Sequence, residues 1–498
     1  MLKKVSLKAV ALLLCLAFAL AVFAACNSNA DKPDDGNSQG GNTDTSGGDN
    51  TETGSNSNGE SNADNENTGD ENTGNENTGD ENNGNENTGD ENTGNENNGD
   101  ENTGDENNGN ENTGDENTNT DPVFDLTGVE PIRYTTLGAD YQYTVGGGSK
   151  LTKYMDEPKE SFLGVCKYFD SNGFKLYGYN EMGNVLAATY TRAGLMMHVY
   201  WIGGELNELA IVNGRESGKA LPPAVPEVTE GKYDTVITQM RAVEADVSTQ
   251  INGMGYVVRL ADGSFLVFDG GYSTRVDELW DTLVTLNGGE DGIVIRAWLL
   301  THGHGDHTQC YFAFADKYAS RVTLETLLFS PFQDETSKYL GALIKFKGAE
   351  ALCVHTGMVF RFCDVKLEIL CATDEIYYDG DSDDYNNSSI VSRIYKDGGK
   401  SCMILGDAGD DVSTRLIPMY GEYLQSDICQ AAHHGVEDFT IEAYRLIRAA
   451  IWFYPCNTKL YNITNRDREV RDEIKNAEYT KKIYLHDRRT RPVESFNS

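Results

Sequence analysis

The sequence lacks three features that would each assign a common chemistry. It has no CxxC pair among its ten cysteines, so a zinc knuckle is not expected. The eight cysteines beyond residue 26 are scattered, several of them in apolar strands, and are typical of core thiols. No G-x-S-x-G stretch is present, so a serine nucleophile on a strand-to-helix turn is not expected either. Finally, basic residues are few: 41 Lys and Arg face 79 Asp and Glu, for a net charge of −38.

The negative charge is spread over the whole chain. Residues 1–122 contain 4 Lys and Arg against 26 Asp and Glu, a net charge of −22, which leaves −16 for the remainder. Because extended nucleic acid is bound through a basic surface, this balance argues against such a partner. It leaves open a small or cell-wall-linked substrate.

The N-terminus reads as a targeting segment, residues 1–25. Three lysines precede an apolar run over residues 9–25, the order found in secretory signal peptides. The run ends in small residues before Cys26, which resembles the bacterial lipoprotein processing box, although Phe23 departs from the usual aliphatic residue. We therefore predict cleavage before Cys26, lipidation of its thiol, and anchoring to the outer face of the bacterial cell membrane. The alternative, one uncleaved transmembrane helix, fits poorly because the run has only 17 residues.

Residues 26–122 are predicted to be a disordered linker. From Asn65 a pentapeptide of the type NENTG or DENTG occurs eleven times without an aromatic or aliphatic residue, so it cannot offset the entropy of ordering. A flexible chain of this length reaches roughly 55 Å, which suits a domain held away from a membrane. An acidic tract that binds cations is the alternative.

Two ordered blocks follow the linker. Residues 123–228 are predicted to form a small α+β module of unassigned role, with an amphipathic helix that places Phe162, Val165, Cys166 and Phe169 on one face. Short Tyr-, Val- and Ile-rich strands separated by turn residues follow. His198 lies in one of these strands and is interpreted as structural.

The second block, residues 233–498, alternates strands and helices in two similar halves. Two mixed sheets packed face to face, with helices outside, would bury this pattern. The fold class is therefore α+β.

The stretch LLTHGHGDHTQC, residues 299–310, carries the chemistry. It contains His302, His304, Asp306 and His307, and it follows an apolar strand and precedes a helix. Sites in α/β folds gather at the carboxyl ends of strands. With glycines between them, His302 and His304 can face one point while Asp306 and His307 serve another. Imidazole and carboxylate are ligands of zinc, manganese and iron; a polar loop without metal is the alternative.

Further ligands are needed elsewhere to complete two metal shells. Asp407 follows an apolar strand and a glycine, and His433 and His434 follow another strand. A carboxylate at a strand end can bridge two cations, and a neutral histidine can complete the second shell.

These motifs resemble the metallo-β-lactamase superfamily. THGHGDH looks like its HxHxDH motif, FDGG at residues 268–271 its early aspartate turn, ILGD its bridging-aspartate motif and HHG its last histidine motif. NNSS at residues 386–389, followed by ILGD and HHG, most resembles the ComEC-like branch and related phosphorylcholine esterases. The resemblance covers roughly residues 233–487. It implies an αββα sandwich with a dinuclear hydrolase site between the sheets.

The resemblance also implies roles for individual residues. His302 and His304 would hold the first metal, Asp306 and His307 the second, and Asp407 would bridge them. One histidine of the 433–434 pair would complete the second shell; His434 is favoured, with His433 then contacting substrate, and the reverse stays open. Asp306 and this pair are also the expected catalytic residues.

Other positions have a less direct connection to the metals. Asp269 would hydrogen-bond a metal ligand. Many members supply one more histidine, for which His355 is the candidate here; otherwise water completes the first shell. His486 is interpreted as structural. The acidic loop at residues 379–387 borders the cleft, holds a cation or is simply solvated.

The expected function is that of a surface-anchored, dinuclear metal-dependent hydrolase. Two divalent cations about 3.5–4 Å apart, zinc or else manganese or iron, lower the pKa of a bridging water toward neutrality, and the resulting hydroxide would cleave a phosphodiester. The alternatives are a surface binding lipoprotein with an inactive metallo-β-lactamase scaffold, and a nuclease.

Overall fold

The structure is a computed structural model of the chain. It describes residues 124–145, 149–214, 217–224, 231–241, 253–330, 335–376, 382–435, 439–463, 468–485 and 491–497. The predicted signal peptide, Cys26, the repeat linker and His486 lie outside the described residues. Within the described part of the chain, no helix combines the length and apolarity that a membrane span requires.

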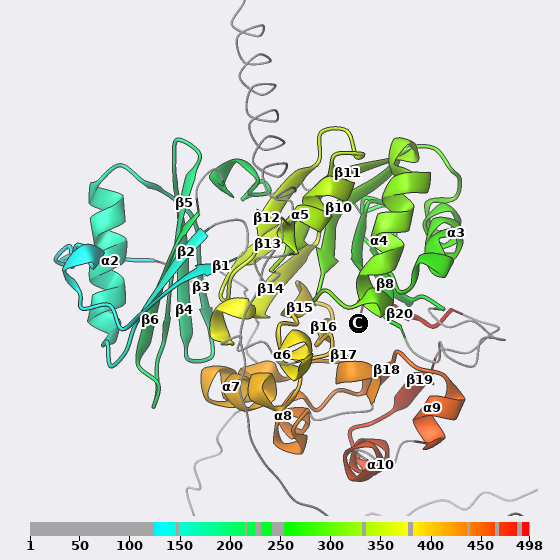
Figure 1. The fold of residues 1–498 in the computed structure, drawn as a ribbon. Coiled ribbons are helices and arrows are strands. Elements are labelled where there is room, and N and C mark those ends of the chain that lie inside the picture. Colours follow the sequence, from blue (N-terminus) through cyan, green and yellow to red (C-terminus); the bar gives the residue numbers. More distant parts are fainter. Residues whose placement is uncertain are drawn as a thin grey trace, which may run out of the picture. The chain divides into compact units, whose positions relative to one another are not determined.

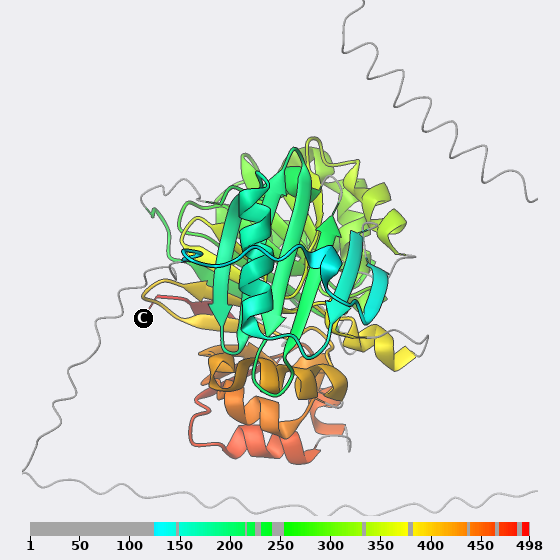
Figure 2. The ribbon, with the colours of Figure 1, turned by 90° about the vertical axis from the view of Figure 1, so that its left-hand side faces the viewer.

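The first block forms one antiparallel sheet covered by a helix. The strand order is β1-β2-β6-β5-β4-β3, and the bounds are β1 (Tyr141–Val145), β2 (Ser149–Tyr154), β3 (Lys175–Met182), β4 (Val185–Arg192), β5 (Leu195–Ile202) and β6 (Glu208–Gly214). Helix α2 (Lys159–Ser171) lies across one face (Figure 2). Its four expected apolar residues are buried against Ala188, Tyr190, Val199 and Ile211.

The second block contains two seven-stranded sheets. One has the order β12-β11-β10-β9-β8-β7-β20 and the other β13-β14-β15-β16-β17-β18-β19. Strands of the first of these sheets are β7 (Val236–Gln239), β8 (Gly255–Arg259), β9 (Phe265–Asp269), β10 (Ile293–Leu300), β11 (Val322–Phe329), β12 (Glu350–Cys353) and β20 (Val493–Ser495). Strands of the other are β13 (Val359–Phe362), β14 (Val365–Cys371), β15 (Val391–Lys396), β16 (Ser401–Ile404), β17 (Ile428–Gln430), β18 (Ile451–Tyr454) and β19 (Lys482–Leu485).

Helices cover the outer faces of this pair of sheets (Figure 1). They are α3 (Val276–Asn287), α4 (Gly305–Lys317), α5 (Thr336–Leu343), α6 (Ser382–Asn387), α7 (Asp410–Tyr420), α8 (Ile441–Ile447), α9 (Thr458–Ile463) and α10 (Arg468–Asn476). One core lies between the sheets, where Phe268 and Leu299 meet Ile369 and Ile404. A second lies under α3 and α4, where Trp298 contacts Phe314. Central parallel strands are thus buried on both faces, which explains their nearly continuous apolar sequences.

The six-stranded sheet of the first block, β1 to β6, packs onto the second block. Val185, Ala187 and Tyr200, on the face opposite α2, share one core with Leu416 and Met419 of α7 and with residues of β14, β16 and β17. The module therefore forms part of the outer layer over the second of the paired sheets, beside α7. All eight cysteines of the described residues are free thiols, and seven of them are buried, in agreement with the prediction of core thiols.

Candidate metal centre

The predicted ligand loop lies between β10 and α4. Because β10 pairs in parallel with β9 and β11, the loop emerges at the carboxyl edge of this sheet. Gly303 and Gly305 do not have a positive φ, so the need for glycine at 303 has another cause. A Cβ on Gly303 would lie 1.9 Å from Glu335 Oε2 and 2.5 Å from Tyr385 Oη. Glu335 and Tyr385 can therefore approach the loop this closely only because residue 303 is a glycine and has no side chain.

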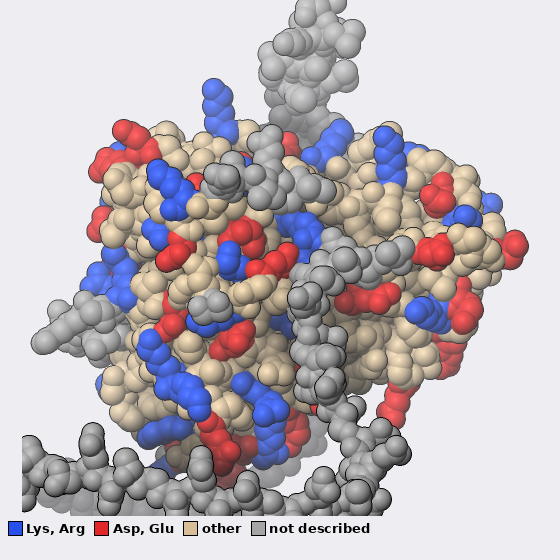
Figure 3. All heavy atoms as spheres, turned by 180° about the vertical axis from the view of Figure 1, so that it is seen from behind, with Lys and Arg blue, Asp and Glu red and all other residues tan. Residues whose placement is uncertain are grey.

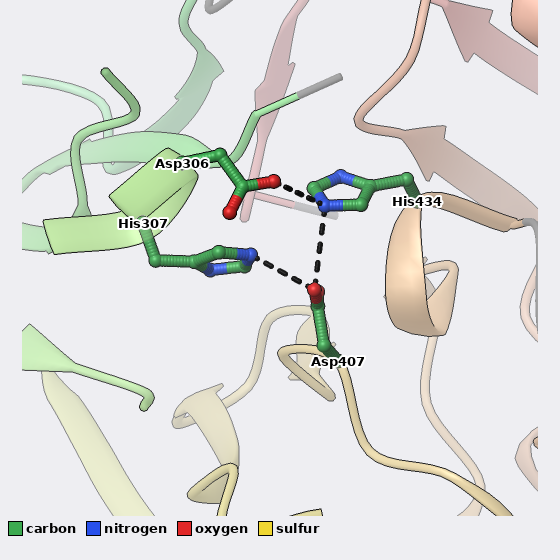
Figure 4. Close-up of side chains that lie close together, drawn as sticks. All are labelled: Asp306, His307, Asp407 and His434. Carbon is green, nitrogen blue, oxygen red and sulfur yellow. Dashed lines mark ion pairs between the residues drawn. The ribbon is translucent and has the colours of Figure 1, made fainter. Parts of the chain in front are cut away.

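The structure brings six of the seven predicted ligands into two groups that share one carboxylate. One consists of His302, His304 and Asp407, and the other of Asp306, His307, Asp407 and His434; within each, the potential ligand atoms lie within 4.8 Å of one another. Figure 4 shows the second group, whose side chains come from α4, from the turn after β16 and from the turn after β17. His434 Nε2 is 3.1 Å from Asp306 Oδ2 and 3.3 Å from Asp407 Oδ2.

Three buried atoms of this group make no hydrogen bond of ordinary geometry: His307 Nε2, His434 Nε2 and Asp407 Oδ1, although the two nitrogens lie 3.1 and 3.3 Å from Asp407 Oδ2. Burying such atoms is costly unless a partner compensates. Two imidazole nitrogens and a carboxylate oxygen converging on one point are a donor set that divalent transition metals accept. The residues therefore fit two cations, with Asp407 contributing to both.

Asp269, which the FDGG motif placed next to the metal ligands, contacts His307. Its Oδ2 lies 2.7 Å from His307 Nδ1, and its Oδ1 accepts the backbone N–H of Thr301 at 2.7 Å. With Nδ1–H donated to the carboxylate, the lone pair of Nε2 points to the metal group. Asp269 is fully buried and has a φ of 51°, a strained conformation that the three contacts of its carboxylate, with His307 and with the N–H and hydroxyl of Thr301, help to maintain. Thr301, whose hydroxyl also donates to Asp269 at 2.7 Å, was missed in the sequence.

Replacing Asp269 with Asn should weaken metal binding or activity about 10–100-fold, the usual cost of losing an outer-shell carboxylate. The amide nitrogen cannot accept the proton of His307 Nδ1, so the imidazole loses its fixed orientation. Titration with Mn²⁺ measures the affinity. Asp262→Asn is the matched control, because Asp262 pairs with Arg296 at 3.0 Å and lies outside both groups; equal effects of the two changes would contradict the assignment.

The turn that carries Asp407 is held by the NNSS motif and by Gln430. Ser389 Oγ accepts the Asp407 N–H at 2.9 Å, and Asn387 Oδ1 accepts the Gly409 N–H at 2.9 Å. Gln430 Oε1 accepts the N–H groups of Leu405 and Gly406 at 2.7 and 2.8 Å. The sequence indicated NNSS only through a family resemblance, and it indicated no role for Gln430. Gln430 is nevertheless a polar residue at the end of the buried strand β17.

Only one histidine of the 433–434 pair enters a ligand group. His434 is buried, and its Nδ1 lies 3.0 Å from the Pro455 carbonyl, which directs Nε2 to the metal group. The His433 side chain is 20% exposed, and its Nε2 is 3.9 Å from Asp407 Oδ2. Both residues have positive φ, 44° and 57°, so the chain turns sharply here and sends the two rings in different directions.

Charges and burial set the protonation of the metal-free site. Burial, together with His307, holds the pKa of His302 well below its usual range, so this imidazole is in the neutral, metal-binding form. Burial also acts to lower the pKa of His434, but the Asp407 and Asp306 carboxylates outweigh it and raise that pKa to about 9. Burial acts to raise the pKa of Asp407, but His307 and His434 hold it well below its usual range.

Metal binding should therefore compete with a proton on His434. Its raised pKa stabilises the metal-free fold below the ordinary value of 6.5, and this stabilisation is lost as the pH rises through about 9. The stabilisation that bound metal gives to the fold increases over the same pH interval, because the cation no longer has to displace a proton from His434. We expect the difference in Tm between Mn²⁺-loaded and chelator-treated protein to increase from pH 6.5 to 9. A constant difference, measured by calorimetry, would contradict this reading.

Two tyrosines near the ligand groups were not predicted from the sequence. The Tyr385 ring lies 4.9 Å from the ring of His304. Tyr272 is half-buried, and burial together with the Asp306 and Asp407 carboxylates raises its pKa to about 12. Tyr385 belongs to the acidic loop at residues 379–387, so the C-terminal end of that loop lies beside His304; residues 379–381 lie outside the described residues.

His355 is not part of the metal centre. It lies in the turn between β12 and β13, fully buried, with Nδ1 3.3 Å from Asp374 Oδ1 and its ring 6.2 Å from that of His198. The His198 ring contacts the Thr189 hydroxyl and the Thr356 carbonyl at 2.9 and 2.8 Å, so it is a satisfied core histidine. Within the described part of the chain, the first group therefore has no third histidine.

Comparison with known proteins agrees with this geometry. Residues 249–374 match the model of the family described as the metallo-beta-lactamase superfamily. The match includes the HxHxDH loop and ends before Asp407 and His434, which the fold supplies to the same site. The predicted fold class, an αββα metallo-β-lactamase sandwich preceded by an α+β module, is confirmed.

Several solved structures are similar at low identity. A diphosphatase of the PhnP family is 14% identical, covers 44% of this chain and 86% of its own, and gives a TM-score of 0.28. CmlA, a diiron β-hydroxylase from Streptomyces venezuelae, is 11% identical over 63% of this chain and 76% of its own, with a TM-score of 0.32. A metallo-β-lactamase from Cronobacter sakazakii is 12% identical over 36% and 66%, with a TM-score of 0.24. Among curated proteins none matches the chain. TM-scores this low carry no argument about activity.

Proposed function

We propose that this protein is a metal-dependent hydrolase that holds two divalent transition cations, zinc or else manganese or iron, and cleaves a phosphodiester. The observation that carries the proposal is Asp407, a buried carboxylate shared by two groups of ligand atoms. The resemblance of NNSS, ILGD and HHG to the ComEC-like branch and to phosphorylcholine esterases favours the phosphodiester. The acidic chain favours a small or wall-linked substrate. On the face of the molecule in Figure 3, basic and acidic side chains of the described residues are interspersed, and they do not form the continuous basic surface that extended nucleic acid requires.

Bound there, two cations would supply a water activated at neutral pH and a positive charge to stabilise the transition state. The residues of the chain orient the ligands of these cations. Asp269 holds the proton on His307 Nδ1, and the Pro455 carbonyl accepts the one on His434 Nδ1, so that both Nε2 atoms remain available. The Tyr385 ring packs beside His304 at 4.9 Å. His433, which is partly exposed and has its Nε2 3.9 Å from Asp407, would contact the substrate.

We also propose a location. The basic and apolar pattern of residues 1–25 supports a signal peptide, and the small residues before Cys26 support lipidation at its thiol. The repeats of residues 26–122 would then hold the catalytic block away from the outer face of the membrane. Mass spectrometry of the membrane fraction tests this: a diacylglyceryl group on an N-terminal Cys26 is expected, and an intact N-terminus would contradict it.

Metal content and a substrate panel test the activity. We expect close to two equivalents of transition metal per chain after reconstitution, and release of p-nitrophenol from bis(p-nitrophenyl) phosphate that a chelator stops. The panel includes a lactone, a β-lactam and double-stranded DNA at several salt concentrations.

Each other outcome rejects the proposal in a different way. Absence of bound metal after reconstitution would indicate the binding lipoprotein with an inactive scaffold. Two bound metals with hydrolysis of only the lactone or lactam would keep the hydrolase and reject the phosphodiester. Salt-dependent cleavage of DNA would indicate the nuclease.

A further inference from the structure

The six-stranded sheet of the first block contacts helix α7, which follows the turn of Asp407, and also the short 3-10 helix η6 (Thr373–Glu375). Helix α7 begins three residues after Asp407, and η6 follows β14. Both pack against the face of the sheet that α2 does not cover. The module of residues 124–220, to which the sequence assigned no role, thus lies against the support of the metal centre.

A buried ionic network joins these parts. The Glu375 side chain is fully buried, and it receives Lys153 Nζ from β2 at 3.2 Å, Arg415 Nη2 from α7 at 2.7 Å and the Tyr200 hydroxyl from β5 at 2.5 Å. Arg415 Nη1 donates at 2.9 Å to Glu208, the first residue of β6. A single guanidinium therefore bridges the sheet, α7 and η6. Removal of one partner would leave an uncompensated buried charge.

Backbone contacts hold the end of α7 to the same sheet. In the turn between β3 and β4, the Asn184 N–H donates to the Met419 carbonyl at 2.8 Å, and its side-chain amide donates to the Pro418 carbonyl at 2.8 Å. Gly183 has a φ of 57°, and a Cβ there would lie 2.7 Å from the Cα of Tyr420. This turn fits closely only if α7 stays in place.

The beginning of α7 is tied to the metal centre. Gly409, directly before the helix, donates to Asn387, and Asn387 Nδ2 donates to Asp411 Oδ2 at 3.2 Å. A packed helix transmits a displacement along its axis because the surrounding core is dense. A shift of α7 at Arg415 would therefore move Gly409 and Asp407.

We infer that the first sheet is a support of the metal centre and that Arg415 and Glu375 are positioning residues, which hold α7 and thereby the Asp407 turn in place. The inference rests on the proposed function only in that it names a metal centre as what is positioned. The substrate-binding role that an appended module could have had is not needed to explain its presence.

Hydrogen exchange of the metal-free, full-length chain tests the positioning directly. In Arg415→Met we expect faster exchange of the amides of residues 386–411 than in the unchanged chain, with β8 to β10 unaffected. The matched control is Arg491→Met, which lies outside that segment: Arg491 pairs with Glu278 at 2.8 Å, and these side chains are 22% and 9% exposed, against 18% and 9% for Arg415 and Glu208. Faster exchange in Arg415→Met that is uniform over the chain, or equal in the control, would show a merely structural ion pair and overturn the inference.

Cobalt supplies the second readout. The absorption spectrum of the Co²⁺-substituted Arg415→Met chain should change, and its affinity for Co²⁺ should fall about tenfold, toward the lower end of the effects seen for outer-shell partners. An unaltered spectrum and affinity in a folded Arg415→Met or Glu208→Gln chain would contradict positioning; the second variant serves if the first does not fold. If the unchanged chain binds no metal, the proposed function fails, while the exchange result still decides the inference.

Discussion

Replacing Asp407 with Asn should lower the rate of phosphodiester hydrolysis about a thousandfold, since losing the metals' stabilisation of the transition state costs several kcal/mol and 1.36 kcal/mol is tenfold in rate. Asp407 is the one residue common to both ligand groups. An amide retains the shape of the carboxylate but not its charge, so neither cation would be neutralised. Metal content should fall from about two equivalents per chain to one or fewer, measured by elemental analysis beside the rate assay.

The loss has to be separated from unfolding. Asp407 is buried, and His307 and His434 surround it, so its neutral replacement also removes attraction within the metal-free protein. Asp364→Asn is the control: Asp364 pairs with Lys396 at 2.5 Å and lies outside both ligand groups. We expect that variant to keep both metals and the full rate. An Asp407→Asn chain with two metals and unreduced turnover would reject the shared-ligand geometry.

The chemistry of the site could be predicted because it is concentrated in short motifs. Four ligand-type residues within six positions after an apolar strand leave few structural alternatives, and Asp407 is marked by the strand and glycine before it. The regular helices and longer strands follow from apolar periodicity. Strands such as β7, with four residues, and β20, with three, are too short to show a period, and they were not predicted.

What could not be predicted depends on contacts between distant residues. The reason for glycine at 303 is the approach of Glu335 and Tyr385, which are 32 and 82 positions away in the chain. His355 lies in a turn that carries the chain from one sheet to the other, and this crossing directs its ring to His198 of the first sheet. The sequence shows the residue type but not that direction. The same holds for Arg415, a single basic residue on a helix whose partners come from both blocks.

The two histidines at 433 and 434 give the sharpest comparison, because neighbouring residues of the same type have different surroundings. His434→Ala should remove one of the two metals and lower the rate about a hundredfold or more, an estimate at the scale of lost electrostatic stabilisation in an active site. His434 is buried with Nε2 between two carboxylates, whereas His433 lies outside both groups. His433→Ala should therefore keep two metals.

The kinetic parameters separate the two variants further. His433 is partly exposed beside the site, so its loss should raise the KM for the substrate without changing the metal content. It should also leave the Co²⁺ spectrum unchanged. In His434→Ala the spectrum should change, because one nitrogen ligand of the second group is gone. Both side chains follow β17 in a turn with positive φ, so alanine at either position meets the same backbone strain, and each variant is the control for the other. If His433→Ala lost the metal and His434→Ala kept it, the ligand would be the residue that the geometry places outside the group.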